Sequence, residues 1–234
     1  MLKRGSDAVH RAAMSREAQK RAAAHAALER VLPRLTRESV VGVGTGSTAN
    51  CFIDELIRHK GVFDAAVASS NASAARLREG GVTVIDLNAA TEVGYYVDGA
   101  DEVDRARRLI KGAGGALARE KIVATASREF ICIVDDSKAV ERLGAFPLPV
   151  EVLPMARGLA ARALVRLGGT PVYRERFVTD NGNVILDVHG LDLSDPAAME
   201  SRINDIVGVV CNGIFAHRAA DVVIVAGATG IRTF

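Results

Sequence analysis

The chain has 234 residues, of which 49% are hydrophobic and 25% are charged, and its formal net charge is only +2. This length allows one large domain or two small ones, with enough apolar residues for a sizeable core. The near balance of charge excludes a general attraction to nucleic acid or to an anionic membrane, so we expect neither as a partner. Any anionic ligand must be held by a local cluster of side chains.

The sequence shows no pattern typical of a metal site or of export. Its three cysteines, Cys51, Cys132 and Cys211, are far apart in apolar runs, so we expect reduced, buried thiols. The five histidines lack HxxxH or HExxH spacing, and we predict no metal site. Residues 1–16 lack the apolar core of a signal peptide and are assigned no role, and no apolar window could span a membrane. We therefore expect a soluble, cytoplasmic protein.

Short apolar strands alternate with helices over the first 145 residues. The predicted strands are 40–43, 65–68, 82–86, 95–97 and 130–134, and the predicted helices are 16–32, one after Ser47, 72–78, and one from the glycines at 112–115 through 126. Strands that are apolar throughout are typical of a parallel sheet covered on both faces. We predict an open, mostly parallel, Rossmann-like α/β domain over 1–145, to which a last strand at 221–225 returns, so that 219–234 belongs to it.

The pattern changes in the second part of the chain. The predicted strands are 148–153, 171–174, 177–188 around a turn at 180–183, and 209–215, and the predicted helices are 155–167 and 196–206. The order β-α-β-β-α-β is that of a ferredoxin-like unit. We predict a smaller α+β domain over 146–218. Its sheet could pair with that of another copy, so we expect a homodimer or a tetramer.

The run GVGTGST at 42–48 joins a predicted strand to a predicted helix. Backbone N–H groups at a helix N-terminus bind phosphate, glycines allow close approach, and hydroxyls add donors. The run is not a Walker A loop, because no Gly-Lys pair precedes the Ser/Thr. Ser47 also stands where a dinucleotide-binding GxGxxG needs its last glycine. A simple strand–helix turn remains the alternative.

Two further loops carry charged groups. The run DGADEVD at 98–104 follows a strand, and a tight turn there could direct Asp98 and Asp101 at one cavity. A solvated acidic loop or a divalent-ion loop is the alternative. The run KGAGGALAREK at 111–121 makes a second anion-binding helix start, with Lys111 as a cation and Glu120 in the early helix. An ordinary helix start with exposed charges is its alternative.

The run DDSK at 135–138 ends another apolar strand, where Lys138 is either a second phosphate contact or a surface lysine. All four loops follow strands, so we expect them to converge on one crevice. Together they offer a phosphate cradle, cations and several carboxylates. That set suits proton transfer next to a carbonyl on a phosphorylated sugar.

These motifs, in this order, resemble type A ribose-5-phosphate isomerase. The resemblance is carried by residues 41–49, 96–102, 111–114, 119–121, 146–152 and 178–187, and it runs from about Lys20 onward. It implies interconversion of D-ribose 5-phosphate and D-ribulose 5-phosphate in the pentose phosphate pathway, without a cofactor. Asn71 stands where many members have Asp, and Ala113 replaces a glycine. Asn keeps the capping chemistry, and neither change affects the inferred base.

The resemblance also implies roles for individual residues. Glu120 would be the base that moves a proton through a cis-enediolate, which Lys111 and nearby glycine amides would stabilise. Asp98 and Asp101 would bind hydroxyls, and Asp98 could also move a proton during ring opening. The implied substrate contacts are Lys20, Thr45, Gly46, Ser47, Thr48, Asp98, Gly99, Ala100, Asp101, Lys111, Gly112, Ala113, Gly114 and Lys138.

Two other functions stay open at this stage. One is a related sugar-phosphate isomerase or deaminase with similar loops, against which the Asp98–Asp101 and Lys111–Glu120 sets argue. The other is a non-catalytic sugar-phosphate sensor. A sensor would need an output module and would not need Glu120, and no helix-turn-helix is recognisable. A panel of substrates would distinguish these alternatives.

Overall fold

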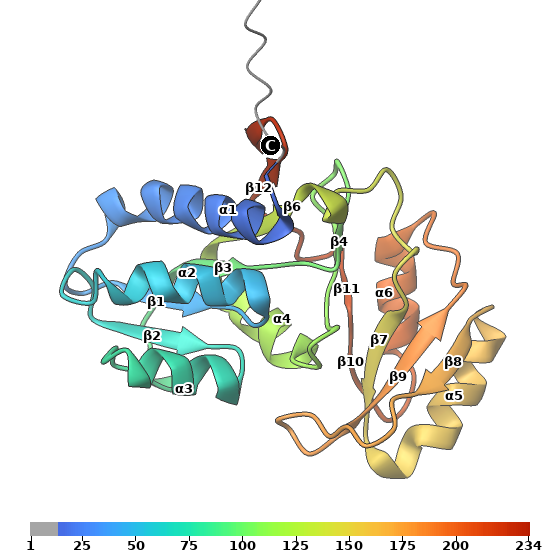
Figure 1. Ribbon diagram of the computed structural model, residues 1–234. Coiled ribbons are helices and arrows are strands. Elements are labelled where there is room, and N and C mark those ends of the chain that lie inside the picture. The colour runs from blue at the N-terminus through green and yellow to red at the C-terminus, as the bar shows by residue number, and fades with distance from the viewer. Residues whose placement is uncertain (1–13) are drawn as a thin grey trace, which may run out of the picture.

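The computed structural model describes residues 14–234, so the predicted N-terminal extension lies almost entirely outside the described residues. Figure 1 shows a layered α/β region beside a smaller region built on a separate antiparallel sheet. No helix in residues 14–234 is long and apolar enough to cross a membrane.

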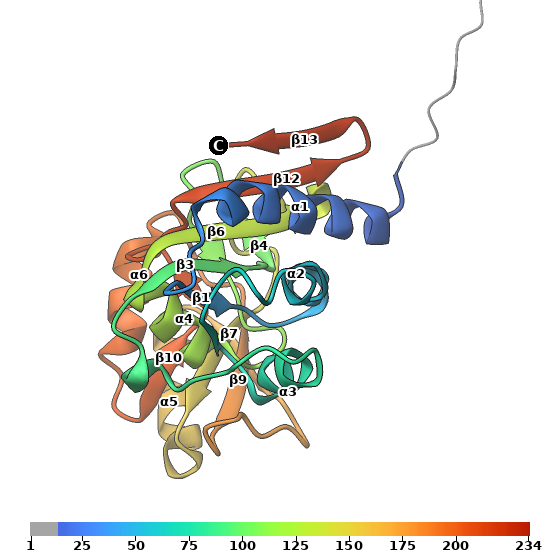
Figure 2. The same cartoon turned by 90° about the vertical axis from the view of Figure 1, so that its left-hand side faces the viewer.

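The larger sheet has six strands in the order β13-β12-β6-β3-β1-β2, and Figure 2 shows most of them one after another. Their bounds are β1 (Val40–Val43), β2 (Ala65–Ala68), β3 (Val93–Asp98), β6 (Ser127–Asp135), β12 (Val222–Gly227) and β13 (Gly230–Thr233). All neighbours pair in parallel except β12 and β13. The parallel pairing agrees with strands that are apolar on both faces.

The predicted strand at 82–86 is wrong. Only Val84 pairs with β2, through an isolated bridge to Ala66. Two hydrogen bonds make this bridge, one accepted by the Thr83 carbonyl and one donated by the Ile85 N–H. If the segment around Val84 is counted as an edge strand and the six parallel strands are numbered in chain order, the sheet has the doubly wound order 3-2-1-4-5-6. The order reverses between β1 and β3, and this is where such folds bind ligands.

Helices cover both faces of the larger sheet. The bounds are α1 (Arg16–Val31), α2 (Ser47–Ile57), α3 (Asn71–Glu79) and α4 (Leu117–Ala126). On one face, α1 packs close through small side chains such as Ala23 and Ala27, and α2 adds Phe52. On the other face, Val123 of α4 packs against Tyr96. The site-bearing ends of β1, β3 and β6 are therefore anchored by two cores.

The smaller region has four antiparallel strands in the order β10-β7-β9-β8, and two helices. Their bounds are β7 (Leu148–Val152), β8 (Thr170–Tyr173), β9 (Val184–His189), β10 (Val209–Asn212), α5 (Arg157–Arg166) and α6 (Pro196–Asn204). The predicted β-α-β-β-α-β order is confirmed. The predicted strand 177–188 begins only at Val184, because the turn at 180–183 and the left-handed Arg176 (φ 54°) keep the preceding residues in a loop.

A third sheet of very short strands joins the two regions. It contains β4 (Glu102–Val103), β5 (Leu109–Ile110) and β11 (Ile214–Phe215), in the order β11-β5-β4. The predicted strand 209–215 is thus divided at Gly213 between two sheets. Gly213 is required there, because a Cβ would lie 2.2 Å from the Lys111 carbonyl oxygen. Single 3-10 turns occupy Leu32–Arg34, Leu87–Ala89, Asp136–Lys138 and Pro154–Ala156.

Candidate active site

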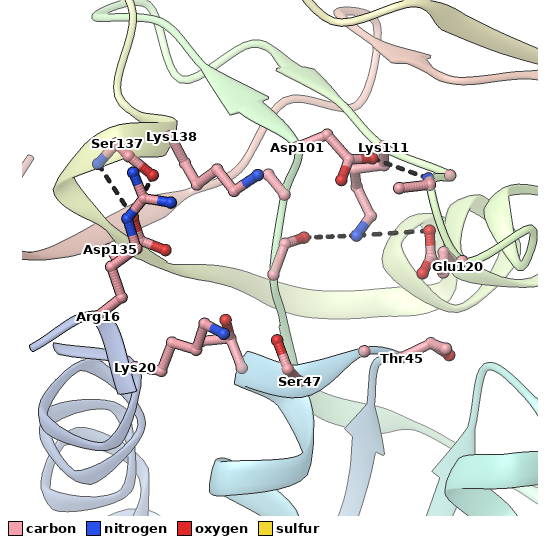
Figure 3. Close-up of a pocket in the computed structure, with 17 residues that line it drawn as sticks. Arg16, Lys20, Thr45, Ser47, Asp101, Lys111, Glu120, Asp135, Ser137 and Lys138 are labelled. Atoms are coloured by element: carbon pink, nitrogen blue, oxygen red, sulfur yellow. Dashed lines mark hydrogen bonds and ion pairs between the residues drawn. The ribbon is translucent and has the colours of Figure 1, made fainter. Parts of the chain in front are cut away.

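A cavity of about 340 Å³ opens at the carboxyl ends of β1, β3 and β6, where the strand order reverses (Figure 3). It is lined by Arg16, Lys20, Thr45, Gly46, Ser47, Thr48, Gly99, Ala100, Asp101, Lys111, Gly112, Ala113, Gly114, Glu120, Asp135, Ser137 and Lys138. A volume of this size matches a small ligand, not a dinucleotide.

The loop after β1 forms one wall. Gly44 passes so close to Asp98 that a Cβ there would lie 1.9 Å from a carboxylate oxygen, so no other residue fits. Gly46, with φ of 105°, precedes α2 and offers no side-chain cap to the first N–H groups of the helix. Ser15 and Ser70 cap α1 and α3 with their side chains. The uncapped amides of α2 are therefore left for an anion in the cavity.

Asp98 lies beneath the cavity and is fully buried. Its carboxylate accepts hydrogen bonds from the Tyr96 hydroxyl (2.5 Å), the Lys111 ammonium (2.7 Å) and the backbone N–H groups of Gly99 and Thr45 (2.7 and 3.0 Å). Four donors occupy its oxygens and it does not line the cavity, so the implied contact between Asp98 and a sugar hydroxyl stays a prediction. What the structure shows is that Asp98 holds Lys111 in place.

Lys111 is almost completely buried at the end of the cavity next to α4. Its ammonium donates to Asp98 and to the Gly99 carbonyl oxygen (2.5 Å), and lies 3.4 Å from Oε2 of Glu120. Burial alone favours the neutral amine, but the Asp98 and Glu120 carboxylates outweigh it and raise the pKa of Lys111. Lys111 therefore presents a fixed positive charge.

Glu120 lies in the first turn of α4, lines the cavity and is only 4% exposed. No donor in the described part of the chain is placed to hydrogen-bond its Oε2. Burial raises the pKa of Glu120 to about 8, against the attraction of Lys111 and with added repulsion from Asp98 and Asp101. A carboxyl group in this state can accept and return a proton near neutral pH.

Asp101 and the glycine loop complete the end of the cavity next to α4. Oδ2 of Asp101 accepts a hydrogen bond from the Ala113 N–H at 2.9 Å, and burial raises the pKa of Asp101. Among residues 14–234, no acceptor pairs with the N–H groups of Gly112 or Gly114. These two amides, together with the Lys111 charge, can bind oxygen atoms that gain negative charge.

The opposite end of the cavity is cationic. Figure 3 shows Arg16, Lys20 and Lys138 gathered there, away from Lys111 and Glu120. The Lys20 ammonium also lies 2.7 Å from Oε1 of Glu17. The cavity thus has a cationic end beside the α2 N-terminus and an end beside α4 where Glu120 and Lys111 face each other. A ligand with a phosphate at one end and a carbonyl at the other matches this polarity.

Comparisons with known proteins agree with this geometry. The family model for ribose 5-phosphate isomerase A (phosphoriboisomerase A) matches residues 65–230. The chain belongs to this family. Ribose 5 phosphate isomerase A from Neisseria gonorrhoeae is 44% identical, with a TM-score of 0.89, and the match covers 95% of this chain and 98% of that one.

Two further ribose 5-phosphate isomerases match over nearly their whole length. One, solved in complex with phospho-erythronic acid, is 35% identical, with a TM-score of 0.89 and coverage of 94% of this chain and 99% of that one. The other, from Methanocaldococcus jannaschii, is 38% identical, with a TM-score of 0.85 and the same coverage.

The structure brings together almost every residue that the resemblance to ribose 5-phosphate isomerase A implied. All the implied substrate contacts except Asp98 line the cavity. Two residues depart from the usual family sequence. Ala113 lines the cavity and donates its N–H to Asp101, while Asn71 lies outside the cavity and accepts a hydrogen bond from Arg119 (2.9 Å).

Three lining residues were not predicted: Arg16, Asp135 and Ser137. Arg16 lies in the stretch to which no role was given, and no pattern marks it. Asp135 accepts a hydrogen bond from the Ser137 N–H at 3.0 Å, which shapes the loop before Lys138. An Asp two residues before a Ser is a turn signal that could have indicated this pair. Within residues 14–234, no group of three or more His, Cys, Asp or Glu is placed to hold a metal ion.

Proposed function

We propose that this chain interconverts D-ribose 5-phosphate and D-ribulose 5-phosphate through a cis-enediolate. Family membership supports the reaction. The observation that carries the mechanism is Glu120, a cavity-lining carboxylate whose Oε2 accepts no hydrogen bond and lies 3.4 Å from a buried ammonium. A base for carbon acids needs this combination of a raised pKa and a nearby positive charge.

In the proposed reaction Glu120 removes the proton from C2 of the open-chain aldose. The electron pair of that C–H bond forms the C1–C2 double bond, and the carbonyl electrons move onto the oxygen at C1. Lys111 and the amides of Gly112 and Gly114 stabilise that negative oxygen. Glu120 then returns the proton to C1, the proton of the C2 hydroxyl passes to the negative oxygen at C1, and the electron pair left on the C2 oxygen forms the carbonyl at C2. Nothing is gained or lost overall, so no redox partner is needed.

The cationic end would hold the phosphate. Ser47 and Thr48 offer hydroxyls and the amides of the α2 start, and Lys138, Lys20 and Arg16 offer positive charge. This binding energy can fix the reacting carbons next to Glu120. The phospho-erythronic acid of a relative supports the assignment, because it combines a phosphate with a carboxylate whose charge resembles that of an enediolate.

We also propose that the enzyme works in the cytoplasm, in the pentose phosphate pathway, without metal or cofactor, as a homodimer or tetramer. An exposed apolar patch supports self-association. Met155 and Val207 are 100% and 78% exposed, and the Leu153 N–H donates to the Gly208 carbonyl, so their segments are neighbours. Changing both Met155 and Val207 to Asp should lower the mass in solution, whereas Ile122→Asp, elsewhere on the surface, should not.

The deciding experiment is a coupled assay of ribose 5-phosphate isomerisation with a chelator present. Glu120→Gln keeps the size of the side chain but removes the basic oxygen, so kcat should fall by roughly 10² to 10⁴. Solvent deuterium should also stop appearing at C2. The exposed Glu141→Gln serves as the control with normal activity.

Several outcomes would contradict the proposal. Near-normal turnover and exchange in Glu120→Gln would place the base elsewhere. A loss of wild-type activity with the chelator, restored by a divalent ion, would show that a metal is needed. Faster turnover of another phosphorylated sugar in a substrate panel would change the assigned substrate.

A further inference from the structure

The glycine loop at 111–115, which lines the end of the cavity next to α4, is held from outside by the smaller region. The Lys111 N–H donates to the Gly213 carbonyl oxygen at 2.9 Å. A Cβ on Gly112 would lie 3.2 Å from Pro149, and one on Gly115 would lie 2.1 Å from the Phe177 ring. Each contact comes from a segment after residue 146, so the loop has the smaller region as its template.

Arg174, which directly follows β8, is the one cation of the smaller region that bonds this loop. Its Nη1 lies 3.1 Å from the Ala113 carbonyl oxygen and 3.4 Å from that of Gly112. Its Nε and Nη2 form a two-pronged ion pair with Asp187, at 2.9 and 2.5 Å. The guanidinium also lies over the Phe177 ring, 5.2 Å from its centroid. Arg174 does not line the cavity.

We propose that Arg174 is a positioning residue for catalysis. By binding the carbonyl oxygens of Gly112 and Ala113, it fixes the orientation of the peptide groups in the loop. These carbonyls share their peptide groups with the N–H of Ala113 and the N–H of Gly114. The Ala113 N–H is thereby directed at Asp101, and the Gly114 N–H stays available to the ligand. Asp187 holds the guanidinium in place through two parallel hydrogen bonds. Only a planar cation with several donors, such as arginine, can bind Asp187 in this way and the loop carbonyls at the same time. This inference rests on the proposed isomerase function.

The segment that carries Phe177 is itself fixed close to the base. Arg119, the residue before Glu120, donates from Nε to Oδ1 of Asn181 (2.8 Å) and from Nη2 to the Asp180 carbonyl oxygen (2.7 Å). The smaller region therefore bonds to both ends of the stretch from the glycine loop to Glu120. Without the Arg174 hydrogen bonds the glycine loop should become more mobile, while the Arg119 hydrogen bonds still fix the start of α4.

The test compares Arg174→Ala and Arg174→Lys with Arg157→Ala. Arg157 is a matched control, since it also stacks on an aromatic ring of the smaller region (4.5 Å over Tyr173) but does not reach the loop. Because displacements of about 1 Å can cost up to roughly 10²-fold, kcat for ribose 5-phosphate should fall about 10- to 100-fold in Arg174→Ala. Inhibition by inorganic phosphate should stay within about twofold, because the phosphate end lies on other loops.

Two further readouts separate positioning from folding. Free guanidinium at low concentration should restore part of the kcat of Arg174→Ala, and Arg174→Lys should recover less than the rescued variant. Arg157→Ala should keep its kcat. The inference is overturned if thermal unfolding shows that Arg174→Ala is folded and its kcat stays within about twofold of the wild-type value. Parallel loss of kcat and phosphate inhibition, with no rescue, also overturns it.

If Arg174→Ala does not fold, Asp187→Asn takes its place, because it weakens the anchor of Arg174 and keeps the shape. An unchanged kcat there overturns the inference. Failure of the proposed function looks different: the wild-type protein itself would not isomerise ribose 5-phosphate. Normal activity of the wild type together with a normal kcat in Arg174→Ala would refute the positioning role of Arg174 and leave the proposed isomerase function intact.

Discussion

Glu120→Gln should make the protein more stable as well as inactive, and the gain should depend on pH. The folded protein binds a proton at Glu120 more tightly than the unfolded chain does, because its pKa is about 8 instead of 4.5. Between these values the stability contributed by the protonated carboxyl is lost as pH rises, and above about 8 it is gone. Glutamine resembles the protonated carboxyl and never acquires the buried charge.

The structure sets the size of the effect. At about 1.36 kcal/mol for each pH unit, the difference between 4.5 and about 8 gives a ceiling of about 5 kcal/mol. We expect a gain of about 2 kcal/mol or more at pH ~9, which for a chain of this size raises Tm by at least ~4 °C. Near pH ~5 the two proteins should unfold at nearly the same temperature, since both are then uncharged at this position.

Thermal unfolding of both proteins across this pH range is the assay. Glu200→Gln is the matched control, because Glu200 is equally buried but fully paired. It accepts hydrogen bonds from Lys121 (2.6 Å) and from the N–H groups of Ala216 and His217 (both 2.9 Å). Its loss should destabilise the protein. A Tm difference for Glu120→Gln that is negative, or that does not change with pH, would refute the reasoning.

Three other predictions follow from the same geometry. In the wild type, kcat/KM should rise with pH along a limb whose midpoint lies well above 4.5, towards 8, because only the deprotonated Glu120 is a base; a flat profile would contradict this. Ser47→Ala and Lys138→Ala should each raise KM about 10-fold or more, as expected for a hydrogen bond to a charged group, and a fall in kcat alone would move them to the chemical step. Gly44→Ala should unfold or inactivate the protein, because its Cβ would lie 1.9 Å from Asp98, whereas Gly94→Ala has no neighbour within 4 Å and should be tolerated in unfolding and activity assays.

Local patterns were enough to predict most of the fold and the four loops that line the cavity, whereas the roles of individual residues were implied by the family resemblance and stay predictions. Apolar strands such as Val40–Val43 identify a parallel sheet without knowledge of partners, and glycine runs before helices indicate loops whose amides are able to bind an anion. The expected strand at 82–86 failed because periodicity cannot reveal that a segment lies at a sheet edge with only one bridge. The two-residue strands of the third sheet are too short to carry any period.

Interactions between distant residues could not be predicted. The sequence does not show that Asp98 accepts hydrogen bonds from Tyr96, Thr45 and Lys111 in the folded chain. The sequence shows that this side chain is acidic, whereas the number of donors that bond its oxygens depends on three-dimensional packing. Arg174 is a plain arginine in a strand–turn segment, and its contact with Ala113 depends on how the two regions meet.

The return of the chain to the larger sheet constrains how the protein is made. β12 pairs with β6 from residue 222 onward, after the whole of 136–221 has been synthesised. During translation β6 therefore carries an apolar edge with unpaired backbone groups, a form of strand that invites aggregation. The intervening residues form β7 to β11, and the edge of β6 stays without its β12 partner until all of them have been synthesised. Vectorial synthesis thus supplies the residues that contact the glycine loop before β12 is available to close the larger sheet.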